Sequence, residues 1–406
     1  MTAPQDILLA RQPIYDTKKE IIAYELLFRE NTDIPNVGVF DGNRATSRVL
    51  LSLFTESDIA TITHNLPAFI NFTAELLHNP PLFEPSSMVI EILEDICITD
   101  KILDSIKKLK AKGYQLALDD FVLHEKYRPL LELVDIVKLE LPAMDDSTLV
   151  ETINNLKQYK VKILAEKIET PELFNRCKEL GCDMFQGYFL AKPEIVKGKK
   201  IAANKMTILN LINEIQAPET DLNELTRIIA RDPALSFKLL KLINSAAFKR
   251  NNTIDSIHRA VTLLGIDKIK SWASLLALSK LDDKPEALHY TALVRALTCE
   301  KLAEYMQLDA KARFYTAGLF SCLDAFFDQE LHEIVKHISL DAQINEALLH
   351  YKGITGLALQ TTLLFEKAQW HKINWSELSR FELCVKQINE IYLEATHLAL
   401  QLSSSS

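Results

Sequence analysis

Long apolar runs are missing from this sequence of 406 residues. A membrane-spanning helix needs roughly 18 continuous apolar residues, and the longest candidate extends only from Trp272 to Leu278. The N-terminus also lacks the basic start and apolar core of a secretory signal peptide. We therefore expect a soluble, cytoplasmic protein.

Positive charge is scarce relative to negative charge. The chain has 46 Lys and Arg residues against 55 Asp and Glu residues, a formal net charge of −9. General nucleic-acid binders need a basic face that neutralises phosphates, and proteins that dock on anionic membranes need one as well. We therefore expect neither nucleic acid nor a membrane among the partners.

Cysteine is also sparse, and the six cysteines are scattered without a CxxC pair. Such spacing gives no sign of a disulfide framework or of a zinc site. It is typical of reduced, mostly buried thiols.

What the first 200 residues do contain is an alternation of short apolar runs and amphipathic stretches. The amphipathic stretches, such as Asp100–Lys112 and Pro171–Leu180, predict helices. Strand and helix in repeated alternation are typical of α/β folds with a parallel sheet, and this many repeats in this length favour a closed barrel of the TIM type. Strands are predicted at Ala68–Thr73, Met88–Leu93, Tyr114–Asp120, Asp135–Leu141, Lys162–Ile168 and Met184–Leu190.

The pattern changes near residues 193–200, a polar segment with proline and glycine, after which only helical patterns follow. Asp221 and Asp232 are typical of helix starts, and Gly265 and Gly353 are typical of helix ends. We therefore predict two domains, an α/β barrel at residues 1–200 and an all-α domain at residues 201–406.

A polar residue lies at or near the end of each predicted strand, at intervals of about one strand–helix unit. In a barrel these residues converge at the mouth where barrel enzymes have their active sites. Any one of them could form a loop salt bridge, but several carboxylates together would repel one another unless a divalent cation lay between them. Oxygen ligands favour Mg²⁺ or Mn²⁺ over Zn²⁺, and such a site can activate water for phosphodiester hydrolysis. The set comprises Glu25, Asn71, Glu91, Asp119, Asp120, Lys138, Glu166 and Gln186.

These residues belong to short motifs spread over residues 5–200. The motifs are RQPIYD at 11–16, ELLFR at 25–29, INF at 70–72, EILE at 91–94, DDF at 119–121, VKL at 137–139, AE at 165–166 with Glu169, and QGY at 186–188 before Pro193. In this order they resemble the EAL domain, the cyclic-di-GMP phosphodiesterase module of bacteria. The resemblance implies a barrel, Mg²⁺ or Mn²⁺ as cofactor, and cyclic-di-GMP as ligand.

The resemblance also implies roles for individual residues. A first metal ion would be bound by Glu25, Asn71, Glu91 and Asp119, and a second by Asp120. In an active enzyme the catalytic residues Lys138 and Glu166 would position the attacking water and the metals. Arg29 would bind a ligand phosphate, and Gln186 would complete the ligand pocket.

The loop after Asp120 departs from the pattern of that family. Active members continue with a flexible Gly-Thr-Gly loop that organises two metal ions and the dimer, and Glu94 would brace this loop. Here residues 121–127 read FVLHEKY, so the loop cannot easily reach φ > 0 conformations. In addition, Glu140 replaces the aspartate of a Lys-x-Asp motif, and Lys167 replaces a glycine between two late glutamates.

Two functions remain open for the barrel. The departures predict an inactive EAL domain that serves as a scaffold or a cyclic-di-GMP sensor. The alternative is an active Mg²⁺- or Mn²⁺-dependent phosphodiesterase that yields linear pGpG and is regulated by the helical half.

The helical half contains DPALS at 232–236, LLKLINSA at 239–246, IHRAV at 257–261 and LLG at 263–265. These motifs resemble the HDOD domain, a helical relative of the HD metal phosphohydrolases, over about residues 200–395. No His-Asp dipeptide occurs in the chain, and Ser321 and Cys322 stand where the metal-binding pair would be. The resemblance therefore implies a domain without a cofactor that binds another protein. The resemblance to the EAL family allows a homodimer as well, although the altered loop at residues 121–127 removes one of its usual supports.

Overall fold

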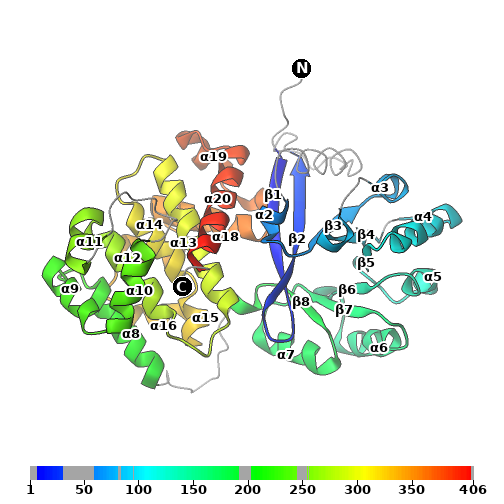
Figure 1. Cartoon of the computed structure of the whole chain (residues 1–406), viewed down its shortest axis with the longest axis horizontal. Coiled ribbons are helices and arrows are strands. Elements are labelled where there is room, and N and C mark those ends of the chain that lie inside the picture. The colour runs from blue at the N-terminus through cyan, green and yellow to red at the C-terminus, as the bar shows by residue number, and fades with distance from the viewer. Residues whose placement is uncertain are drawn as a thin grey trace. The chain divides into compact units, whose positions relative to one another are not determined.

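Figure 1 shows the computed structural model of the chain, which describes residues 7–30, 59–80, 84–94, 96–191, 203–244, 254 and 256–403. Two compact units are present: Met1–Phe189 with Glu366–Ala368, and Leu190–Phe365 with Gln369–Ser406. The predicted domain boundary between residues 200 and 201 lies outside the described residues, so its position stays a prediction.

The first unit is a closed barrel of eight strands that follow one another in sequence order, which confirms the predicted α/β barrel. All neighbouring strands pair in parallel except the first, which is antiparallel to both of its neighbours. The short turn between the first two strands explains this reversal, because a parallel pair would need a long crossover. The strands are β1 Ile7–Tyr15, β2 Ile21–Glu30, β3 Ala68–Phe72, β4 Met88–Ile92, β5 Gln115–Leu118, β6 Ile136–Glu140, β7 Lys162–Glu166 and β8 Met184–Gln186.

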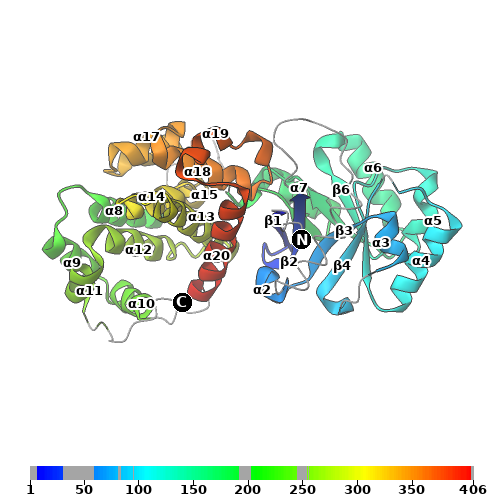
Figure 2. The same cartoon turned by 90° about the horizontal axis from the view of Figure 1, so that it is seen from above.

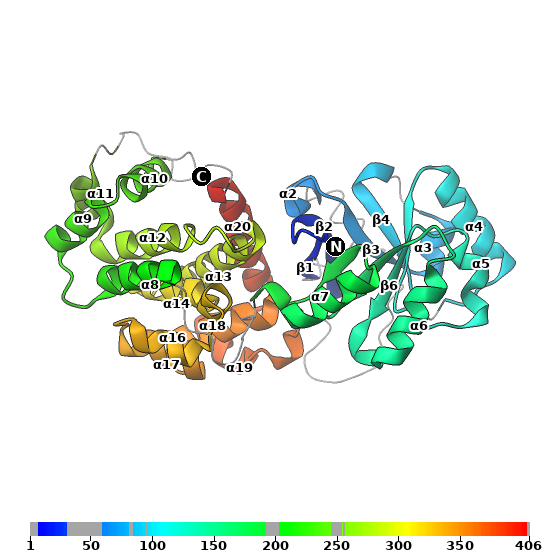
Figure 3. The ribbon, with the colours of Figure 1, turned by 90° about the horizontal axis from the view of Figure 1, so that it is seen from below.

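Helices follow most of the strands, and α4, α5 and α6 lie outside the barrel wall (Figure 3). Three of the helices begin at threonine N-caps, at Thr73, Thr99 and Thr170, whose hydroxyls accept hydrogen bonds from main-chain N–H groups. The helices are α2 Ile59–Thr63, α3 Ala74–His78, α4 Asp100–Ala111, α5 Arg128–Leu131, α6 Asp146–Leu156 and α7 Pro171–Leu180.

An apolar layer fills the barrel interior, and each of the eight strands contributes one buried side chain to it. A small barrel is therefore packed with side chains and has no open channel at this level. The layer consists of Ile14, Ala23, Phe69, Val89, Ala117, Ile136, Leu164 and Met184.

The six predicted strands and the two predicted helices are confirmed, with strand ends that differ from the prediction. The predicted strand Met184–Leu190 ends at Gln186, because Gly187 has a φ of 148° and leaves the extended conformation. Likewise β5 ends before the Asp119-Asp120 pair, since Asp120 has a φ of 40°. Polar side chains at the barrel mouth therefore come partly from strands and partly from the first residues of loops.

The second unit is helical throughout its described residues. Helices α12 and α13 lie between α10 and α11 on one side and α17 and α18 on the other (Figures 2 and 3). The helices are α8 Ala203–Gln216, α9 Leu222–Ala230, α10 Pro233–Ile243, α11 Ile257–Leu264, α12 Ile266–Leu278, α13 Glu286–Tyr305, α14 Lys311–Phe320, α15 Leu323–Phe327, α16 Leu331–Ile334, α17 Ala342–His350, α18 Gly353–Glu366, α19 Trp375–Leu378 and α20 Val385–Ser403.

Most of the predicted helix boundaries in this unit are confirmed. Asp221 and Asp232 are N-caps whose carboxylates accept main-chain hydrogen bonds, and Gly265 ends α11. The prediction that Gly353 ends a helix is wrong, because α17 ends earlier, at a left-handed Tyr351, and Gly353 is the first residue of α18.

Two expectations from composition can be compared with the described residues. None of their helices is both long and apolar enough for a membrane span. All six cysteines are free thiols, four of them buried, while Cys97 and Cys384 are exposed.

The close approach of β8 to the segment after β7 gives a first prediction. A Cβ at Gly187 would lie 2.0 Å from the carbonyl oxygen of Ile168, whereas a Cβ at Gly113 would meet no atom closer than 3.8 Å. Both glycines have positive φ, so alanine strains both backbones by roughly 1–2 kcal/mol. We expect Gly187→Ala to cost about 1–3 kcal/mol more than Gly113→Ala, as in overpacked cores, and thus to lower the melting temperature of the barrel further.

Calorimetry of the two variants measures this difference. About 2–4 °C per kcal/mol is expected for a domain of this size. Equal melting temperatures would show that β8 moves aside without cost.

Candidate functional site

A ring of polar side chains lies above the apolar layer. On every strand except β1, the ring residue is two positions farther along the chain than the residue of the apolar layer. Alternate side chains of a strand point to the same face, so a residue two positions beyond an inward-facing one also faces the interior. On the seven strands that run in one direction, this step leads to Glu25, Asn71, Glu91, Asp119, Lys138, Glu166 and Gln186. The structure therefore brings together seven of the eight residues that the sequence singled out, and Asp120 lies next to them in the chain.

The remaining strand, β1, adds Gln12, which the sequence reasoning missed as a site residue. Because β1 runs the other way, its ring residue lies two positions before Ile14. The side-chain oxygen of Gln12 accepts a hydrogen bond of 3.0 Å from the Gln186 amide, which also donates to Glu25 at 2.6 Å. Gln12 could have been found from the sequence if the first strand had been predicted as antiparallel, because its ring residue then lies two positions before the buried residue instead of after it.

Lys138 is the centre of this ring. Its ammonium nitrogen lies within 3.1 Å of four carboxylates, and its side chain is 1% exposed. The distances from its Nζ are 3.1 Å to Glu25, 2.6 Å to Glu91, 2.7 Å to Asp119 and 3.1 Å to Glu166. One positive charge thus holds four acidic side chains that come from four different strands or strand ends.

The imbalance of charge shifts the pKa values within the ring. Burial raises the pKa of Glu91 well above its usual range and that of Glu166 to about 8, and the charge of Lys138 offsets this only in part. Burial alone would lower the pKa of Lys138, but the surrounding carboxylates raise it well above the usual value. Lys138 therefore stays protonated, while Glu91 and Glu166 keep their protons to a higher pH than exposed glutamates do, because one ammonium cannot balance four carboxylates.

Several buried oxygens of the ring have no hydrogen-bond partner among the described residues. They are Asn71 Oδ1, Gln186 Oε1 and Glu91 Oε2. The other carboxylate oxygen of Glu91, Oε1, lies 2.6 Å from Lys138 Nζ and is satisfied by that ammonium group. Buried acceptors without donors are costly, and a cation would satisfy them. The donor set therefore fits a hard divalent cation.

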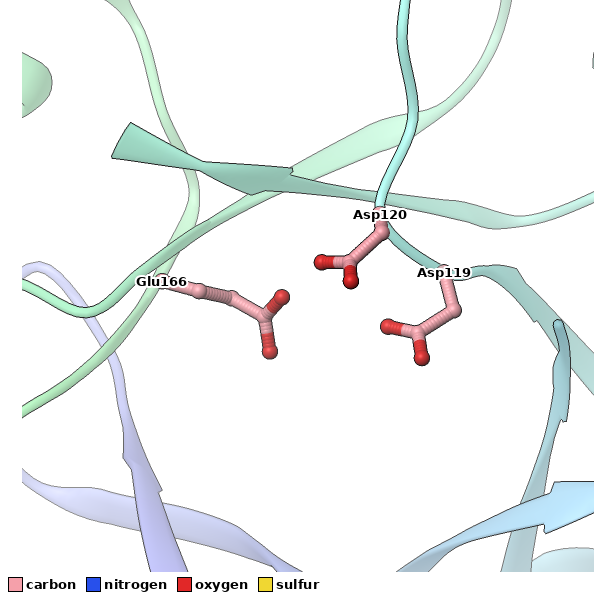
Figure 4. Close-up of side chains that lie close together, drawn as sticks. All are labelled: Asp119, Asp120 and Glu166. Atoms are coloured by element: carbon pink, nitrogen blue, oxygen red, sulfur yellow. The ribbon is translucent and has the colours of Figure 1, made fainter. Parts of the chain in front are cut away.

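Two carboxylates of the ring and the neighbouring carboxylate of Asp120 form a cluster that could bind such an ion. Asp119, Asp120 and Glu166 each offer an oxygen, and these oxygens lie within 4.8 Å of one another. Figure 4 shows the three side chains pointing toward a common space. Asp119 and Asp120 are only partly buried, so this side of the ring is accessible from solvent.

Asp120 has an unusual conformation that turns it toward this space. Its φ of 40° lies in the left-handed region, where a residue other than glycine is strained. The following N–H group, of Phe121, donates a hydrogen bond to the carbonyl oxygen of Lys138 and so holds this backbone in place. Burial, followed by the charges of Asp119 and Glu140, raises the pKa of Asp120 to about 6.

The loop after Asp120 is ordered by two aromatic side chains. Phe121 and Tyr127 are buried and lie 5.6 Å apart between ring centroids, and the Tyr127 hydroxyl donates to the carbonyl oxygen of Glu94. Between them, Val122 and Leu123 are exposed. No residue of this loop has a positive φ, in agreement with its lack of glycine. The segment at Glu94 thus braces the loop through its main chain.

Family models match both parts of the chain. The model of the EAL domain matches residues 51–193, and that of the HDOD domain matches residues 202–349. YuxH of Bacillus subtilis is 33% identical over 96% of this chain and 97% of its own length. CdgJ of Vibrio cholerae, named as a cyclic di-GMP phosphodiesterase, is 33% identical over 90% of this chain and 86% of its own. The chain belongs to the EAL–HDOD family of signalling proteins.

Solved structures of EAL proteins are similar to part of the chain. An EAL domain protein of Listeria monocytogenes is 24% identical over 45% of this chain and 87% of its own, with a TM-score of 0.33. BlrP1 of Klebsiella pneumoniae, solved with calcium and cyclic-di-GMP, is 22% identical over 46% of this chain and 57% of its own, with a TM-score of 0.37.

The described HDOD residues include a buried arginine next to the positions of the missing metal-binding pair. The Nη1 atom of Arg295 on α13 lies 3.2 Å from the Cys322 sulfur and 3.4 Å from the Ser321 hydroxyl oxygen. Burial raises the pKa of nearby Asp324 to about 6, and Arg295 lowers it in part. A thiol, a hydroxyl and a guanidinium do not form a site for a hard metal ion.

One predicted site residue cannot be placed in the EAL domain. Arg29 lies on β2, where it pairs with Leu8, but its side chain is outside the described residues. Its role at a ligand phosphate stays a prediction.

The raised pKa values of the ring predict how the stability of the metal-free EAL domain depends on pH. A carboxyl group whose pKa is higher in the folded than in the unfolded chain binds its proton more tightly when folded. Its contribution to stability is present at about pH 4 and is lost as the pH rises through about 6 for Asp120 and about 8 for Glu166. We expect the free energy of unfolding to fall by a few kcal/mol over this range.

Denaturant unfolding in the presence of a chelator, at a series of pH values, measures this slope. Glu166→Gln should flatten it between about pH 6 and pH 8, because a neutral amide has no proton to lose. Glu172→Gln, on the exposed side of α7, is the control and should keep the slope of the parent. A parent slope of zero would contradict the raised pKa values.

Proposed function

We propose that the EAL domain is a cyclic-di-GMP sensor that binds the nucleotide through a divalent cation, Mg²⁺ or Mn²⁺. The observation that carries this proposal is the cluster of Asp119, Asp120 and Glu166, whose oxygens lie within 4.8 Å of one another at the accessible side of the ring. The nucleotide carries two anionic phosphates, which this acidic mouth would repel without a cation. A cation between carboxylates and phosphate removes that repulsion.

The residues of the ring contribute to the binding of such an ion in two ways: some hold the carboxylates in place, and others offer oxygen ligands. Lys138 keeps Glu25 and Glu91 in place from within, and Gln186 holds the other oxygen of Glu25. Asn71 Oδ1 and Glu91 Oε2 are buried oxygens without donors among the described residues, and Asp119, Asp120 and Glu166 complete the set from the solvent side. A bound divalent ion would supply Lewis acidity toward a phosphate oxygen.

Two features favour binding without efficient hydrolysis. The loop at residues 121–127 is held by Phe121 and Tyr127, so it has little freedom to rearrange around a substrate. Hydrolysis with two metal ions requires both ions to be placed with high accuracy. The second feature is the ammonium group of Lys167, which lies 2.7 Å from Glu140 at the end of β6 and disfavours a second metal ion nearby.

The second candidate is a phosphodiesterase that converts cyclic-di-GMP to linear pGpG under control of the HDOD domain. It is favoured by the intact carboxylate ring and by the relationship to CdgJ, whose name states this activity. In this candidate Lys138 and Glu166 would orient the attacking water.

The HDOD domain is proposed to bind a partner protein and so to pass on the state of the EAL domain. Its described residues offer Ser321 and Cys322 where a phosphohydrolase would bind metal, which supports interaction over a second activity. A homodimer is a further part of this proposal, based on the family.

Calorimetry with the full-length protein, cyclic-di-GMP and Mn²⁺ tests the sensor. We expect binding that requires Mn²⁺ and that becomes at least about tenfold weaker in Asp119→Asn, because one of the three clustered carboxylates that would hold the ion is lost. Asp146→Asn, on the outer helix α6 and exposed, is the matched control and should bind as the parent does.

Turnover in the same samples, measured as pGpG by chromatography, separates the two candidates. Tight binding without pGpG supports the sensor. Metal-dependent turnover that Glu25→Ala abolishes would establish the phosphodiesterase instead. The absence of any binding would rule out both and leave a scaffold.

A further inference from the structure

Lys167 has a backbone conformation that fixes the position of its side chain at the barrel mouth. It directly follows Glu166 and has a φ of 55°, in the left-handed region where glycine is favoured. On its other side Ile168 is buried, and the Ile168 N–H donates to the carbonyl oxygen of Gln186. The residue is therefore held from both sides, and its side chain leaves the backbone in a defined direction.

That direction leads to a carboxylate of the neighbouring strand. Lys167 Nζ lies 2.7 Å from Glu140 Oε2, although the lysine side chain is 58% exposed. Glu140 is the last residue of β6 and pairs in register with Glu166 on β7. The ammonium group thus lies beside the edge of the carboxylate ring.

The same ammonium acts on Asp120. The charges of Asp119, Glu140 and Glu94 raise the pKa of Asp120, and the charge of Lys167 lowers it. The geometry agrees, because Glu140, the partner of Lys167, pairs in register with Glu166, whose carboxylate lies within 4.8 Å of that of Asp120. Within the ring Lys138 neutralises the inner carboxylates, and at the rim Lys167 serves Asp120 and Glu140.

We propose that Lys167 is a fixed cation that occupies the electrostatic place of a second divalent ion beside Asp120, so that the EAL domain binds a single divalent cation. The proposal rests on the proposed function, because it assumes that the carboxylate cluster binds a divalent ion. An ammonium that is already paired with Glu140 both repels a further cation and removes a carboxylate that could bind it.

The number of Mn²⁺ ions bound by the full-length protein, without nucleotide, tests this proposal. Equilibrium dialysis with metal analysis should give one equivalent for the parent and one for Lys167→Arg, which keeps the charge. Lys167→Gly removes the charge and relieves the left-handed strain, and should bind two equivalents.

Lys19→Gly is the matched control. Lys19 also has a positive φ, 68°, but it lies in the turn between β1 and β2, on the other side of the apolar layer from the ring, and packs over Phe174. This variant loses one positive charge and one strained residue, as Lys167→Gly does, and should still bind one equivalent. Two equivalents in Lys19→Gly would mean that net charge alone sets the number, which overturns the proposal.

Other outcomes separate this proposal from the proposed function. Two equivalents in the parent, or one in a folded Lys167→Gly, would overturn the role of Lys167 and leave the metal-dependent sensor intact. No Mn²⁺ in any variant would overturn both. Circular dichroism confirms folding, and the melting temperature with and without Mn²⁺ gives a second measure of binding.

Discussion

The ammonium group of Lys138 is the interaction on which the barrel site depends. Four carboxylates from different parts of the barrel meet around it in an interior where charge is poorly solvated. Without a central cation they could not be ionised together, and removing one partner from such a buried set is strongly destabilising. One ammonium does not balance four carboxylates, however. The pKa values of Glu91 and Glu166 are therefore raised, because burial disfavours the negative charge that Lys138 does not offset. The same group that allows the ring to fold therefore leaves it short of positive charge.

The ring was largely predictable because strand periodicity and barrel closure act together. Once Phe69, Val89 and Leu164 face the interior, Asn71, Glu91 and Glu166 must face it too, since they lie two residues farther along. Gln12 could not be found in this way, because the rule assumed that all strands run in one direction. The antiparallel β1 reverses the step, and a prediction of that reversal requires knowing that the first turn is too short for a crossover.

Backbone conformation is where sequence reasoning was least informative. The lack of glycine after Asp120 was a sound guide to residues 121–127, none of which has a positive φ. Two residues outside this segment, Asp120 just before it and Lys167 after β7, nevertheless adopt left-handed conformations without being glycine. Tertiary hydrogen bonds hold both, from Phe121 to Lys138 and from Ile168 to Gln186. Such strain persists where the surroundings determine it, and no pattern of residue types reveals those surroundings.

Both domains have a fixed cationic side chain next to residues that the family resemblance associates with metal. In the HDOD domain it is Arg295, buried beside Ser321 and Cys322, and a guanidinium cannot be deprotonated to make room for a metal ion. In the EAL domain it is Lys167, exposed and at the rim, with the oxygen ligands still present behind it. In the described residues, the two domains thus differ in the burial of this cation and in the oxygen atoms that lie beside it. In the proposed sensor, the carboxylate oxygens of the EAL domain would bind one divalent ion, and that ion would offset the repulsion between the acidic mouth and a phosphate.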